Sequence, residues 1–434
     1  MTLPLAGVPS KISLWLLFCA SSLLHFWHLG LPAEVVFDES LVGTFSHAYA
    51  RGTYIFDIHP PHLKLIYAAI GQLFGMPEAN PFAIPEVPYH GAFFMAMRMF
   101  PALAGTLIPL LAVGISCLIG CRPGWAMAVG WAFLFDTALM PSSQFILNDI
   151  PMLFFGLSGW WLYGLWRLQG RRRGLFLSCA MLAAASSVKW TGLGFAIPVV
   201  ACMLVDARRH PAAQFRAAAT LACFIVIWQI MGYAAHFAAV GPQPATPIEL
   251  VASTAKLNHQ MAQLAGSVAG HPYGSSWHGW PAGLRGIYIW NDRSETLPAR
   301  IYILPNLWTW WSSAAAMAFL AIRSFAALLR RRPWRMVFNG AARIDLLLLF
   351  AFLANWLPFA FIDRVMFIYH YFPSLAVSLI ALGWAGSSSA LSSRWAAAWA
   401  AGAFAMFVWM FPIVYGIPET PSSFNERMLL PGWR

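Results

Sequence analysis

Residues 12–39 read ISLWLLFCASSLLHFWHLGLPAEVVFDE, an apolar run followed by two adjacent carboxylates, Asp38 and Glu39. A helix needs about 20 mainly apolar residues to cross the hydrocarbon core of a bilayer. A short basic lead at Lys11 precedes the run, but no small-residue cleavage site stands out and ten more hydrophobic runs follow. We therefore expect a retained first membrane span rather than a signal peptide, with the acidic pair just beyond its outer end.

The rest of the chain has the composition of a membrane protein. Of its 434 residues 59% are hydrophobic and 10% are charged, whereas about a quarter of residues are charged in soluble domains. Recurring apolar runs predict an all-α, polytopic bundle of about 11 transmembrane helices, forming a single membrane-embedded unit over residues 1–434. The predicted spans are 12–30, 90–119, 124–140, 151–168, 174–188, 191–205, 217–237, 302–325, 344–361, 366–385 and 395–416.

The charges indicate how the bundle is oriented. Short loops on the side of the N-terminus hold 16 of the 27 Lys and Arg, among them Arg171 to Arg173, Arg330 to Arg332 and Arg335. Cytoplasmic loops retain Lys and Arg, so this side is expected to be cytoplasmic. The net charge of +11 therefore indicates topology, and we expect no nucleic-acid partner. The six cysteines lack CxxC spacing, so the sequence predicts neither a zinc site nor a disulfide framework.

Two outer connections, 32–88 and 238–300, are much longer than any cytoplasmic link, and loops of this length in a compact protein usually have a function. Apolar residues recur in the first loop at helical spacing, which predicts two amphipathic helices lying in the membrane interface. These residues are Phe37, Leu41 and Phe45 in one helix and Leu63, Ile66, Ile70 and Leu73 in the other. His59-Pro60-Pro61 is expected to start the second helix, because proline is tolerated in a first helical turn.

The acidic pair has two interpretations. Asp38 could cap the first interfacial helix while Glu39 complements the helix dipole. Alternatively, Asp38 is a general base that removes a proton from an attacking hydroxyl, and Glu39 positions the acceptor or the base. Adjacent helical residues point about 100° apart, so the two carboxylates need not share one role.

Several longer motifs resemble the protein O-mannosyltransferases. Residues 37–75, FDESLVGTFSHAYARGTYIFDIHPPHLKLIYAAIGQLFG, look like the first luminal loop of that family, with its Asp-Glu pair and His-Pro-Pro-x-x-Lys element. Further matches follow in the family's order over most of the chain. They are Arg98 with Pro101 and Gly105, SVKWTGL at 187–193, HPYGSSWHGWP at 271–281, Trp310-Trp311, and RVMFIYHYFPSL at 364–375.

The resemblance implies a glycosyltransferase of the GT-C-like class. It implies an enzyme that moves mannose, with inversion and without a covalent glycosyl-enzyme, from a polyprenyl-phosphate donor to Ser or Thr hydroxyls of exported polypeptides. The chain departs from the family at His62, usually apolar, at Asn148-Asp149, usually Leu-Asp, and in a second outer loop too short for an extra luminal domain. These departures leave the sugar and the acceptor open. By the same resemblance, the missing loop domain and the absence of a retention signal favour a bacterial inner membrane with the site facing the periplasm.

The leaving phosphate needs cations nearby, since water cannot solvate it well at the membrane surface. Arg98 lies inside an apolar run, where an ionisable residue is functional by default, although a buried ion pair with an outer acid is the alternative. Lys64 could reach the phosphate or extend toward the headgroups. The resemblance adds Arg364 and His370 as donor contacts, and Tyr369-His370-Tyr371 could instead be an aromatic anchor.

The remaining candidates are substrate-positioning residues, namely His59, Asp149, Lys189, Trp190, His271 and Tyr273. Asp149 could equally cap a helix. No metal site is predicted, although Asp136 or Asp149 could help Asp38 hold a divalent cation such as Mg²⁺ or Mn²⁺.

Three questions stay open at this level. Eukaryotic members of the family pair as dimers, so a dimer is one of the alternatives. The same donor site would serve transfer to a lipid or glycan acceptor. A lipid or sugar transporter is a rival from another class, but it predicts ionisable residues along a path across the bilayer, whereas the acids here gather at one face.

Overall fold

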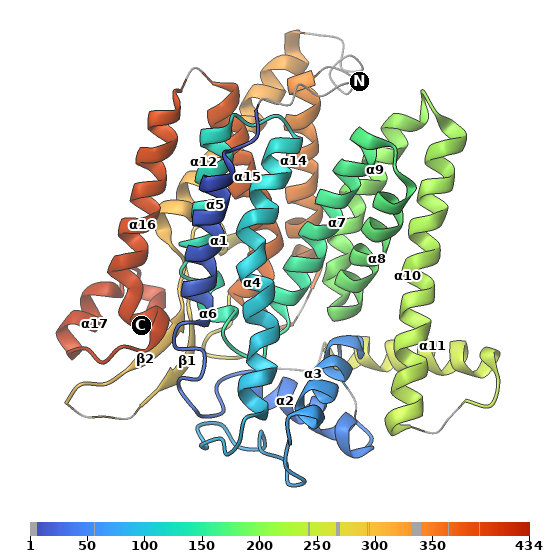
Figure 1. Ribbon diagram of the computed structural model, residues 1–434, viewed down its shortest axis with the longest axis vertical. Helices are drawn as coiled ribbons and strands as arrows, with labels where there is room; N and C mark the ends of the chain where they lie inside the picture. The colour runs from blue at the N-terminus through green and yellow to red at the C-terminus, as the bar shows by residue number, and fades with distance from the viewer. Residues whose placement is uncertain are drawn as a thin grey trace.

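The computed structural model describes residues 7–55, 57–241, 244–265, 270–292, 294, 296–330, 340–362, 364–389 and 391–434. Long helices run side by side along the molecule, and short helices with a β-hairpin gather at one end (Figure 1). That end carries both long outer loops, so we call it the outer end. Of the basic residues assigned to cytoplasmic loops, Arg331, Arg332 and Arg335 lie outside the described residues.

A described helix overlies each of the eleven predicted spans. These helices are α1 (Lys11–Phe26), α4 (Phe93–Leu118), α5 (Pro123–Leu134), α7 (Asp149–Gln169), α8 (Arg172–Val188), α9 (Ala196–Ala207), α10 (Pro211–Val240), α12 (Leu307–Arg330), α14 (Gly340–Trp356), α15 (Phe372–Ser388) and α16 (Ser393–Tyr415). Within the described chain, seven helical segments are long and apolar enough to cross a membrane. Because α1, α5, α7 and α8 are not among them, the crossing of all eleven stays a prediction.

Among the seven candidate membrane spans the most buried is the one that contains α15, which packs against α5, α12 and α14 near the centre of the bundle. Two glycines of α15 permit the close approach of α5: a Cβ at Gly383 would lie 2.4 Å from Val129, and one at Gly386 would lie 2.5 Å from Trp125. On the other side of the core, α7 packs against α4 and α8. The outer ends of these central helices surround the site described below.

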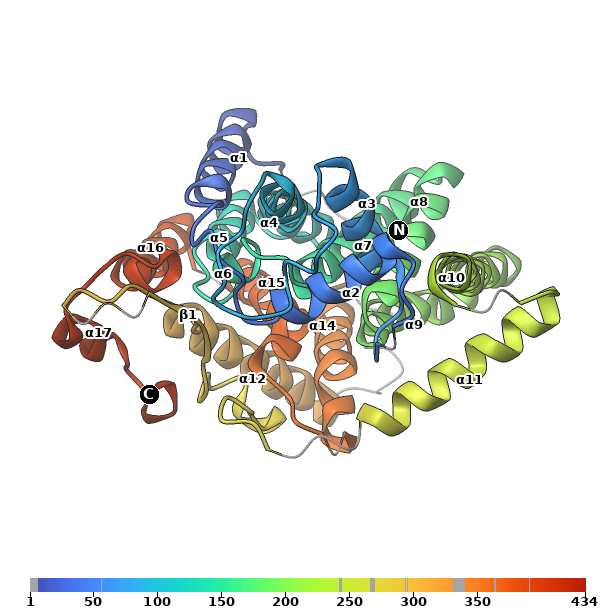
Figure 2. The same ribbon diagram turned by 90° about the horizontal axis from the view of Figure 1, so that it is seen from below.

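The two helices predicted in the first outer loop are confirmed as α2 (Glu39–Arg51) and α3 (His62–Leu73). The helix α3 begins directly after Pro61, as the His-Pro-Pro element predicts. The buried face differs from the predicted stripe, since Leu63 and Tyr67 are buried while Leu73 is 80% exposed. Viewed from the outer end, α2 crosses the middle of the bundle (Figure 2).

The second outer loop contains α11 (Pro247–Ala265), which extends along the edge of the molecule, and a hairpin (Figure 2). Strands β1 (Ile287–Asn291) and β2 (Arg300–Ile303) pair antiparallel, with Ile287 opposite Ile303 and an irregularity between Tyr288 and Trp290. The described chain is mainly helical, as predicted, and this two-stranded sheet is an addition to the helical bundle. The span predicted from residue 302 was wrong at its start, because alternating buried isoleucines place Ile301 and Ile303 in a strand before α12 begins.

The span predicted at 124–140 is also interrupted. The helix α5 ends at Leu134, and the short α6 (Leu139–Ser142) follows. The break is stabilised by Asp136, whose Oδ1 accepts the backbone N–H groups of Ala138 and Leu139 at 3.0 Å. Short helices complete the described chain: η1 (Trp190–Phe195), η2 (Trp277–Gly279), η3 (Leu357–Phe361), η4 (Ile368–Tyr371), α17 (Pro421–Arg427) and η5 (Pro431–Trp433).

Candidate active site

Asp38 and Glu39 lie where the first outer loop turns into α2, and their side chains have different surroundings. Asp38 occupies the N-cap position but makes no side-chain capping hydrogen bond. The capping interpretation is therefore wrong. The Asp38 carboxylate instead lines a cavity, whereas Glu39 points into the protein and is fully buried.

Glu39 forms a buried ion pair with Arg98 of α4. Arg98 donates from Nε to Oε1 at 2.8 Å and from Nη2 to Oε2 at 2.7 Å, and both side chains are fully buried. The Tyr89 hydroxyl and the backbone N–H groups of Val36 and Ile146 also donate to the Glu39 carboxylate. Both oxygens of the Glu39 carboxylate therefore accept hydrogen bonds, which a buried charge requires.

Arg98 is equally well satisfied. Its remaining guanidinium N–H groups donate to the backbone carbonyls of Pro32 at 2.8 Å, Glu34 at 3.0 Å and Leu29 at 3.4 Å. Neither Glu39 nor Arg98 lines the cavity, so the predicted contacts of Glu39 with an acceptor and of Arg98 with a phosphate are corrected; that Glu39 positions the base stays a prediction. The ion-pair alternative for Arg98 holds: the pair joins α2 and α4 to the loop that follows α1.

The cavity beside Asp38 has a volume of about 280 Å³ and is closed by α2, α3, the start of α7 and the segment before α15. It brings together eight of the twelve predicted site residues, which come from five separate stretches of the chain. These eight are Asp38, His59, Lys64, Asp149, Lys189, His271, Arg364 and His370. Among the other lining residues are Asp57, Asn148, Phe367 and Tyr369.

Burial raises the pKa of the Asp38 carboxyl to about 6. The positive charge of Lys189 acts against this shift, Asp149 acts with it, and the Tyr369 hydroxyl donates a hydrogen bond to Asp38. Asp38 is thus mostly ionised at neutral pH, yet it binds a proton more readily than an exposed aspartate. A general base is expected to have such a pKa, close to the working pH.

Two of the three cations in the cavity are paired with acids. Lys189 donates to both Asp149 oxygens at 2.8 and 2.9 Å, and its Nζ lies 4.6 Å from the centre of the Tyr369 ring. Lys64 forms an ion pair with Asp57 and is 1% exposed, so it does not extend toward the headgroups. Burial lowers the pKa of Lys64.

Arg364 is the third cation, and no acid among the described residues forms an ion pair with it. Its guanidinium group lines the cavity. An unpaired guanidinium in a partly closed cavity is suited to bind a planar or tetrahedral oxyanion. Arg364 is therefore the cavity's best-placed partner for an anionic ligand.

Three histidines complete the polar wall. His59 has a pKa well below the ordinary value, first because it is buried and then because Lys64, Lys189 and Arg364 are close, so it is neutral. His370 is held by its Nδ1, 3.0 Å from the Phe367 carbonyl oxygen, in η4. His271 lies at the exposed rim, where its Nδ1 accepts the backbone N–H of Tyr273.

The structure places the last two predicted residues outside the cavity lining. Trp190 begins η1 and is 36% exposed, and Tyr273 stacks on Tyr288 of the hairpin with ring centroids 6.1 Å apart. Their substrate-positioning roles are not supported by direct contact with the cavity. Tyr369, in contrast, does more than anchor the chain at the membrane interface, because its hydroxyl forms a hydrogen bond with Asp38. That hydroxyl is therefore already engaged and is not free to bind the sugar donor.

Two residues of the cavity were missed by sequence reasoning. Asp57 lies two residues before His59 and pairs with Lys64, a relation that becomes visible only when the loop folds back on α3. Asn148 lines the cavity with an Oδ1 that is buried and has no partner among the described residues. Asn148 differs from the leucine that the family usually has, but a place just before a helix does not predict that its side chain lines a cavity.

The residues do not fit a divalent cation well. No group of three or more His, Cys, Asp or Glu suited to a metal occurs in the described chain. Asp149 is bound by Lys189, and Asp136 accepts hydrogen bonds from Trp310 at 2.8 Å and Thr309 at 3.2 Å, away from the cavity. No step is therefore assigned to a metal.

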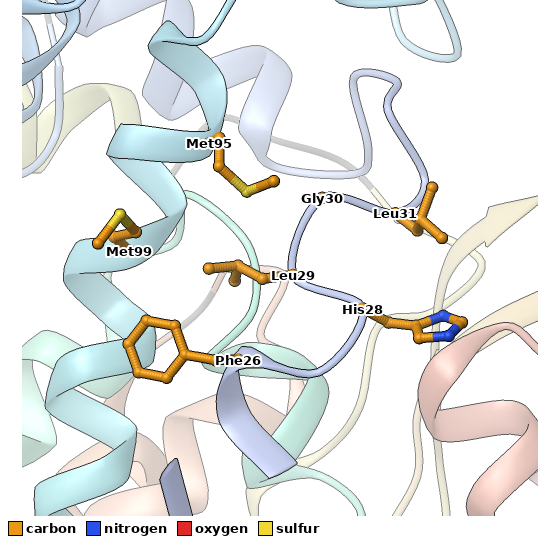
Figure 3. Close-up of a pocket in the computed structure, with 7 residues that line it drawn as sticks. All are labelled: Phe26, His28, Leu29, Gly30, Leu31, Met95 and Met99. Carbon is orange, nitrogen blue, oxygen red and sulfur yellow. The ribbon is translucent and has the colours of Figure 1, made fainter. Parts of the chain in front are cut away.

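A second cavity, of about 560 Å³, lies between the end of α1 and the first turns of α4. Phe26, Leu29 and Met95 extend into the space between the two segments, Met99 lies against α4, and His28 points away from the methionines (Figure 3). The residues that line this cavity are apolar apart from His28, and they include no carboxylate. Of the two cavities, that of Asp38 is the one lined by carboxylates.

Comparison with known proteins agrees with these observations. The family described as dolichyl-phosphate-mannose-protein mannosyltransferase matches residues 15–239, and the C-terminal four TMM region of protein-O-mannosyltransferase matches residues 250–433. Dolichyl-phosphate-mannose–protein mannosyltransferase 4 of Schizosaccharomyces pombe is 34% identical over 146 residues, 33% of this chain and 19% of the relative. Protein O-mannosyl-transferase 2 of Drosophila melanogaster is 30% identical over 212 residues, 44% of this chain and 27% of the relative. The matches thus span about a fifth to a quarter of these relatives.

Solved structures share the fold. The Saccharomyces cerevisiae protein O-mannosyltransferase Pmt1–Pmt2 complex bound to the sugar donor superposes with a TM-score of 0.84 at 16% identity, covering 99% of this chain and 94% of that one. ArnT from Cupriavidus metallidurans bound to undecaprenyl phosphate gives 0.52 at 14% identity, covering 93% and 71%. The GT-C-like fold is therefore confirmed, and this is an integral membrane protein. With more than half of its length matched by the family model, the chain belongs to the dolichyl-phosphate-mannose-protein mannosyltransferase family.

Proposed function

We propose that this protein transfers mannose from a polyprenyl-phosphate donor to Ser or Thr hydroxyls of exported polypeptides. One observation carries the proposal: a single cavity at the outer end holds a carboxylate with a raised pKa, Asp38, together with an arginine that has no acid partner in the described chain, Arg364. These are the two groups that transfer from a lipid phosphate requires, a base for the alcohol and a cation for the leaving group.

The proposed reaction is a single displacement. Asp38 removes the proton of the acceptor hydroxyl as its oxygen attacks the anomeric carbon, and the bond from that carbon to the phosphate oxygen breaks. The new glycosidic bond forms on the face opposite the departing phosphate, so the anomeric configuration inverts and no covalent enzyme intermediate forms. The proton ends on Asp38, and the electron pair of the broken bond ends on the polyprenyl phosphate.

Arg364 is proposed to bind the phosphate and to stabilise its growing charge. Lys64 and Lys189 add positive potential, although Asp57 and Asp149 partly neutralise them. His370 lies in the same wall; because its Nδ1–H donates to the Phe367 carbonyl oxygen, its Nε2 can accept a hydrogen bond from a sugar hydroxyl. Neutral His59 can form hydrogen bonds to substrate without adding charge.

The test measures label transfer by purified full-length protein. Labelled polyprenyl-phosphate mannose is incubated with a Ser/Thr-rich acceptor peptide, using wild type, Asp38→Asn and the matched control Asp292→Asn, which removes an exposed acid outside the cavity. We expect label in the peptide with wild type and the control, and none with Asp38→Asn. Full transfer by a folded Asp38→Asn variant would remove the assignment of the base.

The same assay separates the rival functions. Label recovered in lipid or glycan and not in peptide would support the alternative acceptor class. Movement of the donor across a proteoliposome membrane with no new glycosidic bond would support a transporter. Peptide label contradicts both rivals.

We further propose a bacterial inner membrane with the cavity facing the periplasm, and a dimer as the assembly. The short second outer loop supports the first, and the two-chain yeast complex of the same fold supports the second. Cysteine-accessibility labelling at the exposed Leu73 in whole cells tests the orientation. The mass of the detergent-solubilised particle tests the dimer.

A further inference from the structure

The carboxamide of Asn148 is an unused polar group in the wall of the cavity. Asn148 is 7% exposed and precedes α7 as its N-cap residue, but its side chain makes no capping hydrogen bond. Its Oδ1 is buried and has no hydrogen-bond partner among the described residues. Buried polar atoms without partners are rare in folded proteins and are unfavourable unless a ligand or water completes them.

The backbone around Asn148 is held firmly next to the acidic pair. The Ile146 N–H donates to Oε1 of Glu39 at 3.0 Å, and the Tyr67 hydroxyl donates to the Leu147 carbonyl at 2.9 Å. On the other side, Asp149 is fixed by Lys189. The Asn148 side chain is therefore presented to the cavity by a rigid segment that is bonded to the residue adjacent to Asp38.

The chemistry of a carboxamide restricts what it can recognise. Oδ1 needs a hydrogen-bond donor, which an ionised phosphate and an isoprenoid chain both lack. In the proposed function Arg364 binds the phosphate, and the neutral carboxamide of Asn148 adds no charge to that interaction. A sugar hydroxyl donates and accepts at once, so it can satisfy either end of the carboxamide.

We infer that Asn148 is a specificity-determining residue that hydrogen-bonds one hydroxyl of the transferred sugar. The inference rests on the proposed function and deepens it. A cavity built to bind a hydroxyl discriminates strongly against an analogue that lacks it, because the buried amide is then left without a partner. Asn148 therefore contributes to the choice of sugar rather than to the displacement itself.

The experiment measures binding of polyprenyl-phosphate mannose and of its 2-, 3-, 4- and 6-deoxy forms to the full-length protein in detergent. For wild type, one deoxy donor is expected to bind at least about tenfold more weakly than the parent. In Asn148→Leu, the parent and that same deoxy donor are expected to bind within about twofold of each other. Asn148→Ala provides the same comparison if leucine is not accommodated.

The matched control is Asn355→Leu, which removes another buried carboxamide with an unpartnered Oδ1 that does not line the cavity. In this control, the ratio of the dissociation constant of the deoxy donor to that of the parent donor should equal the wild-type ratio. A ratio that is unchanged in Asn148→Leu, or a wild type that distinguishes none of the deoxy donors, would overturn the inference. Wild-type binding of mannose donor without peptide label contradicts the proposed function instead, so the two failures are distinguishable.

Discussion

Asp38 and Glu39 are neighbours in the sequence, but they belong to two different regions, the cavity at the outer end and the buried contact between α2 and α4. Glu39 receives five hydrogen bonds, two of them from Arg98, one from Tyr89 and two from backbone N–H groups. Asp38 receives one side-chain hydrogen bond, from Tyr369, and has a raised pKa. The difference indicates that the saturated carboxylate stabilises the fold, while the undersatisfied one is available to take a proton.

The largest expected effect on activity is that of Asp38→Asn. Removing a general base lowers transfer by roughly 10²- to 10⁴-fold. Stability should change in the opposite direction: the raised pKa means that folding stability is lost as pH rises from about 4 to about 6. At pH 8 the neutral variant should therefore be more stable, by up to about 3 kcal/mol. Thermal unfolding in detergent at pH 5 and pH 8 measures this, and a destabilised variant would contradict it.

For the buried ion pair of Glu39 and Arg98, removal of one charge should lower the stability of the protein instead of raising it. Arg98→Met leaves Glu39 charged, buried and unpaired, which is expected to destabilise the protein by about 3 to 5 kcal/mol. The double variant Glu39→Gln/Arg98→Met should recover part of this loss, because no unpaired charge remains. Arg167→Met is the control, since its ion pair with Asp206 is 30% exposed at the arginine and should have little effect. Equal unfolding temperatures for Arg98→Met and Arg167→Met would contradict the comparison.

Within the cavity, Arg364→Met should lower kcat/KM for the polyprenyl-phosphate donor without unfolding the chain. Loss of one side chain that stabilises the leaving phosphate is expected to raise the activation free energy by about 2 to 4 kcal/mol and so to lower kcat/KM. The exposed Arg285, which does not line the cavity, provides the control Arg285→Met. Unchanged donor kinetics in Arg364→Met would assign the phosphate to another cation.

The smallest expected effect is that of Tyr369→Phe, and it is visible chiefly in the pH profile. Wild-type kcat/KM should rise about tenfold per pH unit below pH 6 and level off above it, because Asp38 must be ionised to accept a proton. The Tyr369 hydrogen bond stabilises the ionised form, so its removal should move the rise to higher pH, by about one unit. A profile that falls everywhere without moving would indicate a structural role instead.

Sequence reasoning named eight residues that the structure brings together, because the cavity is assembled from short motifs. The outer location, the two helices of the first loop and eight cavity residues follow from hydropathy and from the motif resemblance. Its failures have specific causes. The end of a strand, Tyr302 and Ile303, was included in an apolar span, and an arginine inside an apolar run was assigned to substrate when its partner was Glu39.

The sequence by itself determined a membrane bundle and predicted that its acids gather at one face, because apolar length and charge asymmetry act locally along the chain. Only the tertiary structure decided which charges are paired. Asp57 meets Lys64, Asp149 meets Lys189 and Glu39 meets Arg98, and this leaves Asp38 and Arg364 without ion pairs within the described chain. Pairing depends on distances between segments far apart in sequence, and it separates a charge that stabilises the fold from one that can act on a substrate.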